Sequence, residues 1–282
     1  EKVLESPQEI AEIRANYAAL LAMCDAYFGE LLGRFDALDL WRDTALVLTT
    51  DHGFLLSDHG WWGKNRMPYY EEISHIPLLV WHPDFTGQGG ARRAMLTQTI
   101  DLMPTLLEMF GLDVPPEVRG HSLMPCLGGG SRLRDVGAFG MFGGPIGATD
   151  GRFAYYLFPE DLEGPELYEY TLMPTHIRSR FTPEELRTAA LAAPFDFTKG
   201  APVLRYQALP GAQRAPMQDG TGFADIGTVL FDLAQDPRQE SPMRDEGVEA
   251  RLRAGIRAEL EAHDAPAEFL ARYGLQPATP TP

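Results

Sequence analysis

The amino-terminal part of the chain has the apolar spacing of a long amphipathic helix. Ser6-Pro7-Gln8-Glu9 combines a serine, a first-turn proline and a glutamate in the order typical of a helix start. Apolar residues then recur at steps of three and four, which is the period of one helix face. We expect this face to be buried; its members are Ile10, Ile13, Tyr17, Leu20, Leu21, Cys24, Phe28, Leu31, Leu32 and Phe35.

Strand and helix patterns alternate after this helix. Apolar runs predict strands at 45–50 and 76–81, and helical spacing predicts helices at 68–74 and 101–110. This alternation favours an α/β layer with a parallel or mixed sheet. In such sheets, sites form beyond the carboxyl ends of the strands, which is where Asp51-His52 stands.

The pattern changes at about residue 126, where glycine-rich breakers begin. We expect residues 1–125 to form one α/β core and residues 126–282 to form a smaller α+β subdomain. Within the subdomain, the segment 159–228 is rich in proline and polar turns, which indicates an insertion. The other elements expected there are strands at 152–158 and 229–233, helices at 183–191 and 245–262, and a disordered tail at 277–282.

Composition and charge narrow the classes of partner. The 282 residues are 44% hydrophobic and 23% charged, as in ordinary globular proteins. A net charge of -16 argues against a nucleic-acid partner, because phosphate backbones bind basic surfaces. The sequence has no apolar run near the roughly 20 residues of a membrane span. An anionic substrate would need a local positive centre in so acidic a protein.

The two cysteines, Cys24 and Cys126, are too few for a disulfide framework, and we interpret both as buried small hydrophobes. The cytoplasm and the periplasm are both allowed compartments. The sequence begins with Glu1 and carries no signal peptide, so we expect it to begin inside a longer gene product.

The segment TTDHGFLLSDHGWWGKN, residues 49–65, gathers the most suggestive side chains. Asp51 offers a carboxylate and His52 an imidazole, so together they could bind one divalent cation. The alternative for Asp51 is a hydrogen bond within its own turn. Lys64 could present a point charge to an anion, or be an ordinary solvated lysine.

Two further groups are candidates for substrate contact. His59 could be a ligand, a proton donor or a satisfied loop histidine. The segment 175–180 includes His176 and Arg178 and concentrates positive charge in an acidic protein. It could line a pocket for an anionic substrate or form a surface ion-pair patch.

Several stretches, taken in order, resemble the carboxyl-terminal half of a sulfatase, in the alkaline-phosphatase-like superfamily. The similarity spans most of 10–125 and 150–245. The matching stretches are Thr49-Thr50-Asp51-His52-Gly53, Asp58-His59-Gly60, Trp62-Gly63-Lys64, Tyr70-Glu71-Glu72, Ile76-Pro77-Leu78, Asp101-Leu102-Met103-Pro104-Thr105-Leu106, Gly120-His121-Ser122-Leu123, Leu230-Phe231-Asp232-Leu233 and Asp236-Pro237.

The resemblance implies a fold and a set of roles. Residues 1–125 would be the second half of the catalytic core, part of a mixed sheet sandwiched by helices. Asp51 and His52 would bind the cation, calcium or manganese, and Lys64 would contact the sulfate and act in catalysis. His59, His176 and Arg178 are the remaining candidates for substrate binding. His75 stands where the family often has an arginine, so no role is carried over to it.

The implied activity is metal-dependent hydrolysis of a small sulfate ester. The alternatives are hydrolysis of phosphonate monoesters or phosphodiesters, and a non-catalytic fragment. Sulfatases carry their nucleophile in a Cys/Ser-x-Pro-x-Arg segment whose first residue is oxidised to formylglycine. Neither Cys24 nor Cys126 stands in such a segment. We therefore expect the 282 residues alone to be inactive, and to form homo-oligomers or associate with a missing amino-terminal half.

Overall fold

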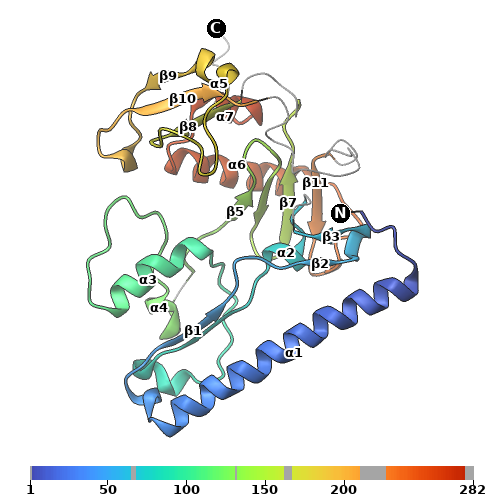
Figure 1. Ribbon diagram of the computed structural model, residues 1–282, viewed down its shortest axis with the longest axis vertical. Helices are drawn as coiled ribbons and strands as arrows, with labels where there is room; N and C mark the ends of the chain where they lie inside the picture. Colours follow the sequence, from blue (N-terminus) through green and yellow to red (C-terminus); the bar gives the residue numbers. More distant parts are fainter. Residues whose placement is uncertain (1, 65–67, 131, 162–166, 210–226, 277–282) are drawn as a thin grey trace. The chain divides into compact units, whose positions relative to one another are not determined.

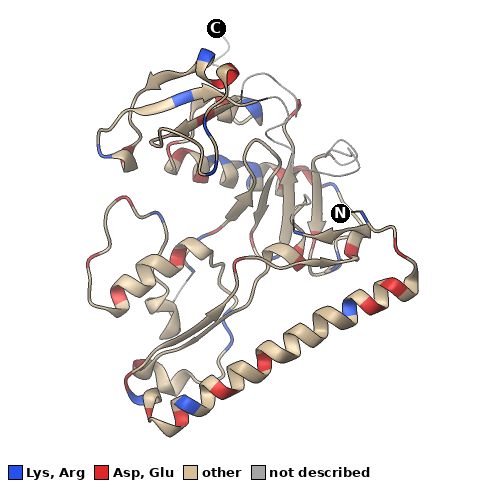
Figure 2. Ribbon diagram, in the orientation of Figure 1, with Lys and Arg blue, Asp and Glu red and all other residues tan. Residues whose placement is uncertain are grey.

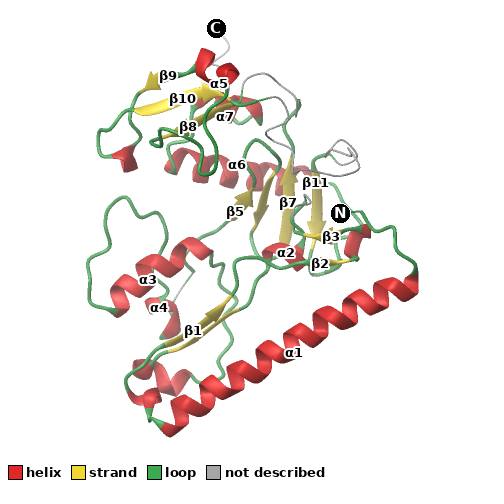
Figure 3. Cartoon of the chain, viewed as in Figure 1, coloured by secondary structure: helices red, strands yellow, loops and turns green. Residues whose placement is uncertain are grey.

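The computed structural model describes residues 2–64, 68–130, 132–161, 167–209 and 227–276. Contacts divide the chain into two compact units, of which the first comprises Glu1–Met95 and Ser122–Arg132. The second comprises Leu96–His121 and Leu133–Pro282. Both units combine helices with short sheets (Figure 3). The division expected from the sequence, with an α/β core at 1–125 and a smaller subdomain at 126–282, stays a prediction. The predicted tail at 277–282 lies outside the described residues.

Helix α1 (Pro7–Ala37) of the first unit begins where the sequence predicts (Figure 1). The Ser6 hydroxyl accepts from the Glu9 amide at 3.4 Å, and the Glu9 carboxylate accepts from the Ser6 amide at 2.8 Å. This reciprocal pair satisfies two amides that the first turn leaves without partners. At the other end, Phe35 packs against Trp41 with ring centres 4.7 Å apart.

The expectation that α1 buries one face within this chain is wrong. Phe35 is the one residue of α1 that is buried, whereas Leu20 is 60% exposed and Leu21 61%. Cys24 is exposed too, which contradicts its interpretation as a buried hydrophobe, while Cys126 is buried as predicted. The helical period tells which residues share a face, but not whether anything covers that face.

Strands β1 (Leu46–Thr49) and β4 (Leu78–Trp81) form an antiparallel ribbon at the two predicted positions. Leu46 lies opposite Trp81, whose ring meets Trp41 edge-on at 5.2 Å. Strand β1 ends two residues before Asp51, so its carboxyl end leads directly into the candidate loop. Every strand pairing among the described residues is antiparallel.

A small hairpin follows β1. Strands β2 (Leu55–Leu56) and β3 (Trp62–Gly63) pair antiparallel around the short 3₁₀ turn η2 (Asp58–Gly60). Helix α2 (Glu71–Ser74) comes next and is shorter than the predicted 68–74. The other elements of this unit are η1 (Leu40–Arg42), η3 (Pro83–Gln88) and α4 (Met124–Leu127).

The second unit is built on a four-stranded sheet in the order β11-β7-β6-β5. Its strands are β5 (Gly137–Gly140), β6 (Ile146–Thr149), β7 (Phe153–Leu157) and β11 (Val229–Asp232). Helices α6 (Glu246–Ala262) and α7 (Ala267–Arg272) complete the core. The buried cluster there is Val136, Ile146, Ala148, Tyr155, Leu157, Leu230, Leu252, Ile256, Tyr273 and Leu275.

The predicted insertion, 159–228, contains a second, three-stranded sheet. Its order is β8 (Tyr168–Thr171), β10 (Val203–Gln207) and β9 (Ala190–Ala192), with α5 (Pro183–Thr188) and η5 (Asp196–Thr198) beside it in sequence. The helix predicted at 183–191 therefore ends early, because its last residues join β9. Residues 162–166 and 210–226 of the insertion lie outside the described residues.

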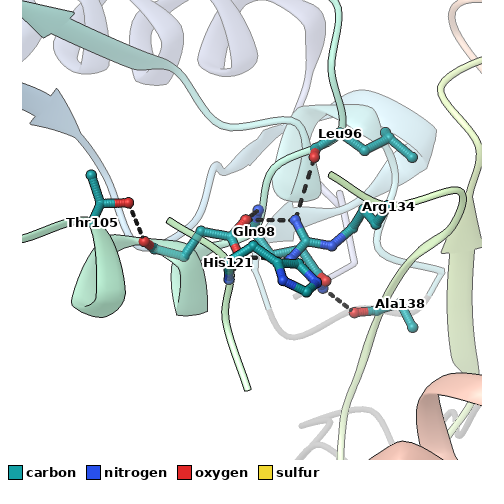
Figure 4. Close-up of polar contacts among 7 residues, drawn as sticks. Leu96, Gln98, Thr105, His121, Arg134 and Ala138 are labelled. Atoms are coloured by element: carbon teal, nitrogen blue, oxygen red, sulfur yellow. Dashed lines mark hydrogen bonds and ion pairs between the residues drawn. The ribbon is translucent and has the colours of Figure 1, made fainter. Parts of the chain in front are cut away.

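A buried ion pair organises the start of the second unit, at η4 (Thr99–Asp101) and α3 (Leu102–Met109). Arg134 donates two hydrogen bonds to the Asp101 carboxylate, at 2.5 and 2.6 Å. The backbone amides of Gln98 and His121 donate to the same carboxylate at 2.7 and 2.8 Å (Figure 4). The pair thereby joins three separated segments of the chain.

Among the helices in the described ranges, none has the length and apolar character needed to cross a membrane.

Candidate functional site

Asp51 and His52 lie together just beyond the end of β1. The His52 amide donates to Asp51 Oδ1 at 3.0 Å, so this carboxylate does stabilise its own turn. The other oxygen, Oδ2, lies 3.3 Å from His52 Nε2. Adjacent side chains in a strand point to opposite faces. Here the strand has ended, and the two side chains converge.

Gly53 lets this loop lie directly on α2. Its amide donates to the Ile73 carbonyl at 2.8 Å, and the Phe54 amide donates to the Glu72 carbonyl at 3.1 Å. A Cβ at position 53 would lie 1.8 Å from the Glu72 carbonyl oxygen. Only glycine fits, because any side chain would force the loop and α2 apart.

The imidazole of His52 is held in one orientation and one tautomer. Its Nδ1 lies 2.9 Å from the Gly53 carbonyl oxygen, which can only accept a hydrogen bond. Nδ1 therefore carries the proton, and Nε2 presents a lone pair. The Lys64 ammonium lies 2.5 Å from Nε2 and donates to it. The predicted residues Asp51, His52 and Lys64 thus meet in one place.

The Asp51 carboxylate is charged at this site. Partial desolvation would raise its pKa, but His52, backbone amide hydrogen bonds and Lys64 outweigh that effect and lower the pKa. Its side chain is 81% exposed. Asp51 therefore stands as an accessible anion beside the Nε2 lone pair.

The donors at this site fit part of the shell of a divalent cation. Asp51 supplies a hard oxygen and His52 a neutral imidazole nitrogen, both of which bind such ions. The Lys64 ammonium donates a hydrogen bond to Nε2, so one positive charge already lies beside this lone pair. Among the described residues, no group of three or more His, Cys, Asp or Glu side chains is arranged to hold a metal. Further ligands would have to come from other groups.

Lys64 reaches His52 because the β2–β3 hairpin folds the chain back. The hairpin is tied down from outside, since Arg14 of α1 donates to the Leu56 carbonyl and to the Ser57 hydroxyl, both at 2.7 Å. The indole of Trp62, next to Gly63, donates to Glu5 at 2.8 Å. A hairpin with two residues in each strand needs such support.

His59 is at the turn of this hairpin with its side chain only 11% exposed. Its ring stacks on Tyr70 with centres 3.6 Å apart, and its Nε2 lies 3.5 Å from Glu72 Oε2. Glu72 and Tyr70 were not singled out by sequence reasoning. The spacing Tyr70-Glu71-Glu72 belonged to the family pattern, but only the fold brings it against His59.

The two candidates of the second unit have different surroundings. His176 Nε2 lies 2.9 Å from the buried Glu185 carboxylate, and its ring meets Phe181 edge-on at 4.7 Å. Arg178 is exposed in the following loop. Substrate contact by His59, His176 and Arg178 stays a prediction.

Comparison with known proteins gives the family. Residues 2–112 match the sequence model of the sulfatase family, whose description is "Sulfatase". This region belongs to the sulfatase family. It contains Asp51, His52 and Lys64.

Two curated sulfatases are similar to this region. Arylsulfatase K of Xenopus laevis is 39% identical over 124 residues, which are 44% of this chain and 22% of that protein. N-acetylglucosamine-6-O-sulfatase of Bacteroides thetaiotaomicron is 33% identical over 112 residues, 40% of this chain and 20% of that protein. The matched part thus spans about a fifth of the length of these sulfatases.

Solved structures confirm the predicted fold class. The phosphonate monoester hydrolase of Agrobacterium radiobacter superposes with a TM-score of 0.56 at 21% identity. The superposition covers 92% of this chain and 42% of that one. The chain therefore has part of an alkaline-phosphatase-like α/β fold.

Proposed function

We propose that this sulfatase-family chain forms part of an enzyme that hydrolyses sulfuric esters with the help of a divalent cation. One observation carries the proposal: Asp51, His52 and Lys64 converge, with Lys64 Nζ 2.5 Å from His52 Nε2 and Asp51 Oδ2 3.3 Å from the same atom. An anion, a neutral imidazole and an ammonium side by side suit the binding of a cation and a sulfate group.

Each residue has a distinct task in this proposal. Asp51 and His52 hold the cation, and the Gly53 carbonyl keeps the Nε2 lone pair of His52 turned towards it. Lys64 turns its ammonium to the sulfate oxygens and stabilises the negative charge that they carry during transfer. Calcium and manganese both accept this donor pair. When bound, the cation supplies a Lewis acid for the sulfate oxygens.

The attacking group is expected from elsewhere. Neither cysteine of this chain stands in a Cys/Ser-x-Pro-x-Arg segment: Cys24 precedes Asp25-Ala26-Tyr27 and Cys126 precedes Leu127-Gly128-Gly129. By resemblance, a formylglycine made from such a segment is the nucleophile. We therefore propose that the 282 residues are inactive alone and complete their site by association with a segment that carries such a nucleophile.

The proposed substrate is a small sulfate ester. The similarity to arylsulfatase K and to N-acetylglucosamine-6-O-sulfatase supports this class. Local positive charge at Lys64 and at the cation would attract such an anion despite the acidic surface. The exposed Arg178 is a candidate for a further contact with it.

Hydrolysis of aryl sulfate and aryl phosphonate esters by the intact protein tests the proposal. We expect turnover of the sulfate ester that is lost after chelation and restored by calcium or manganese. Turnover of the phosphonate ester alone would favour the phosphonate hydrolase alternative. If neither ester is hydrolysed by a preparation shown to contain formylglycine, the proposed activity is wrong.

A further inference from the structure

His59 is held in an uncommon backbone conformation at the turn of the β2–β3 hairpin. Its φ is +54°, and two neighbours in the turn, Ser57 at +74° and Gly60 at +75°, also have positive values. Glycine adopts such values freely, whereas histidine and serine adopt them at a cost. Backbone strain of this kind persists only when surrounding contacts impose it, and it clusters at functional sites.

The contacts that impose this conformation come from α2 and the residue before it. The His59 ring lies on Tyr70 with centres 3.6 Å apart and planes within 10° of each other. Its Nε2 faces Glu72 Oε2 at 3.5 Å, and both atoms are buried. Neither atom makes a hydrogen bond with any described part of the chain. The 3.5 Å approach thus places two buried polar atoms, neither of them hydrogen-bonded, next to each other.

Glu72 also touches the opposite arm of the loop. Its carbonyl oxygen accepts from the Phe54 amide at 3.1 Å and occupies the space of a Gly53 side chain. Gly53 directly follows His52, and its carbonyl fixes the His52 ring. One residue of α2 thus contacts the start of the loop through its backbone and the turn of the hairpin through its carboxylate.

We propose that His59 and Glu72 are positioning residues that set the distance between His52 and Lys64. The pair clasps the hairpin turn onto α2 while the backbone of α2 holds Gly53 and Phe54. The hairpin then returns Lys64 to the His52 ring in a fixed register. Neither residue touches the reacting groups in this account. The importance of the His59–Glu72 pair for catalysis rests on the proposed function. The effect of the pair on the distance between His52 and Lys64 does not.

If His59 and Glu72 hold the turn together, substitution of either residue should displace it. Glu72 Oε2 is buried, although the Glu72 side chain as a whole is 30% exposed. Removal of the imidazole would leave this oxygen without its neighbour, so Glu72 should turn towards water and the hairpin turn should loosen from α2. Small displacements of a charged group at a reaction centre have large effects on rate. The effect of either substitution should therefore appear at Lys64 and His52, some residues away from the change.

The test uses three variants of the intact protein, compared with wild type. His59→Phe keeps a flat ring for Tyr70 and removes Nε2, and Glu72→Gln removes the charge with little change in size. His75→Phe is the matched control, because His75 pairs with Glu71 on the same helix at 2.6 Å but its side chain is 76% exposed. The first readout is the ring ¹⁵N spectrum of His52 in metal-free protein, assigned with His52→Gln and calibrated with Lys64→Ala.

We expect His59→Phe and Glu72→Gln to move the His52 Nε2 resonance at least half-way towards its position in Lys64→Ala. His75→Phe should leave it in place. A merely structural pair would lower the melting temperature without moving this resonance in the folded protein. If His59→Phe does not fold, Glu72→Gln decides. An unchanged His52 resonance in the folded variants would overturn the proposal.

The second readout is the binding of Mn²⁺, followed by broadening of the His52 ring signals. We expect the dissociation constant to rise about tenfold in both variants, the low end of the ~10–100-fold known for groups that orient metal ligands. If the wild type binds no Mn²⁺ at His52, the proposed metal site fails. The metal-free spectrum still decides the positioning role in that case.

Discussion

At the scale of single residues, the sequence indicates which side chains are candidates for the chemistry but not how they meet. Asp51 and His52 stand after an apolar strand, and that placement is enough to single them out. The contact between His52 and Lys64 depends on the register of the β2–β3 hairpin, in which Leu55 lies opposite Gly63. Strands of two residues leave no periodic pattern, so the pattern could not predict this contact, and only the family resemblance placed Lys64 at the site of Asp51 and His52.

Lys64→Ala tests the separate tasks of the three residues. We expect kcat with an aryl sulfate ester to fall at least about a hundredfold, as on removal of one charge-stabilising donor. The bound metal should remain, because Asp51 and His52 are unchanged. Metal content and initial rates measured on the same samples check this. A loss of metal together with the rate would mean that Lys64 supports the metal site instead.

Asp101 gives a prediction for stability against pH. Burial would raise its pKa, but the hydrogen bonds from Arg134, His121 and Gln98 outweigh burial and lower the pKa. A lowered pKa in the folded state means stability that is present above the unfolded value of ~3.9 and lost as the pH falls through the folded value. Urea unfolding of wild type should therefore show a marked loss below about pH 4.

Asp101→Asn should remove this contribution at neutral pH. Arg134 would stay buried without its anion, which costs roughly 3–5 kcal/mol of unfolding free energy. The variant should also lose less stability than wild type between neutral and acid pH. Glu184→Gln is the control, because Glu184 pairs with Arg187 at 3.2 Å but is 61% exposed. Equal acid sensitivity of Asp101→Asn and wild type would contradict this account.

At the scale of elements, long periodic segments were predicted well and short glycine-rich ones were not. Helices α1 and α6 and strands β1, β4, β7 and β11 lie within a few residues of their expected positions. Strands β5 and β6 were missed because glycines dilute their pattern, and Gly143-Gly144 forms the turn between them. The helix predicted at 183–191 is longer than α5, because Ala190–Ala192 forms a strand without having strand propensity of its own.

Two glycine substitutions test two different roles of glycine: close contact with another backbone segment and low helix propensity. Gly53→Ala should destabilise the protein by several kcal/mol and weaken metal binding, because the new Cβ would meet the Glu72 carbonyl. Gly29→Ala, in the middle of α1, has no atom within 4 Å of the new Cβ. It should stabilise the helix by up to ~1 kcal/mol. Thermal unfolding of the two variants checks the expected loss and the expected gain of stability. A stable Gly53→Ala variant with normal metal affinity would refute the close contact.

At the scale of the whole molecule, the chain exposes apolar surface that an independent domain would cover. The stretch 15–24 of α1 carries no charged residue, which Figure 2 shows as an unbroken tan segment. Tyr17, Leu20, Leu21 and Met23 in that stretch are each 41–61% exposed. Exposed apolar surface on this scale usually marks an interface.

We expect the isolated 282-residue polypeptide to self-associate, and not to hydrolyse sulfate esters. Leu20→Lys combined with Leu21→Glu should shift sedimentation towards the monomer at equal concentration. The control variant, Gln8→Glu combined with Glu12→Lys at the charged end of the helix, should have little effect. A monomeric wild-type polypeptide at high concentration would contradict this prediction.

The most direct test of the central claim is to measure bound metal and aryl sulfate hydrolysis together, in intact wild-type protein and in His52→Ala and Asp51→Ala. We predict that wild type binds calcium or manganese and turns over the ester, and that both variants lose metal and rate in parallel. If either variant keeps its metal content and its rate, Asp51 and His52 do not form the metal site, and the proposed function loses its basis.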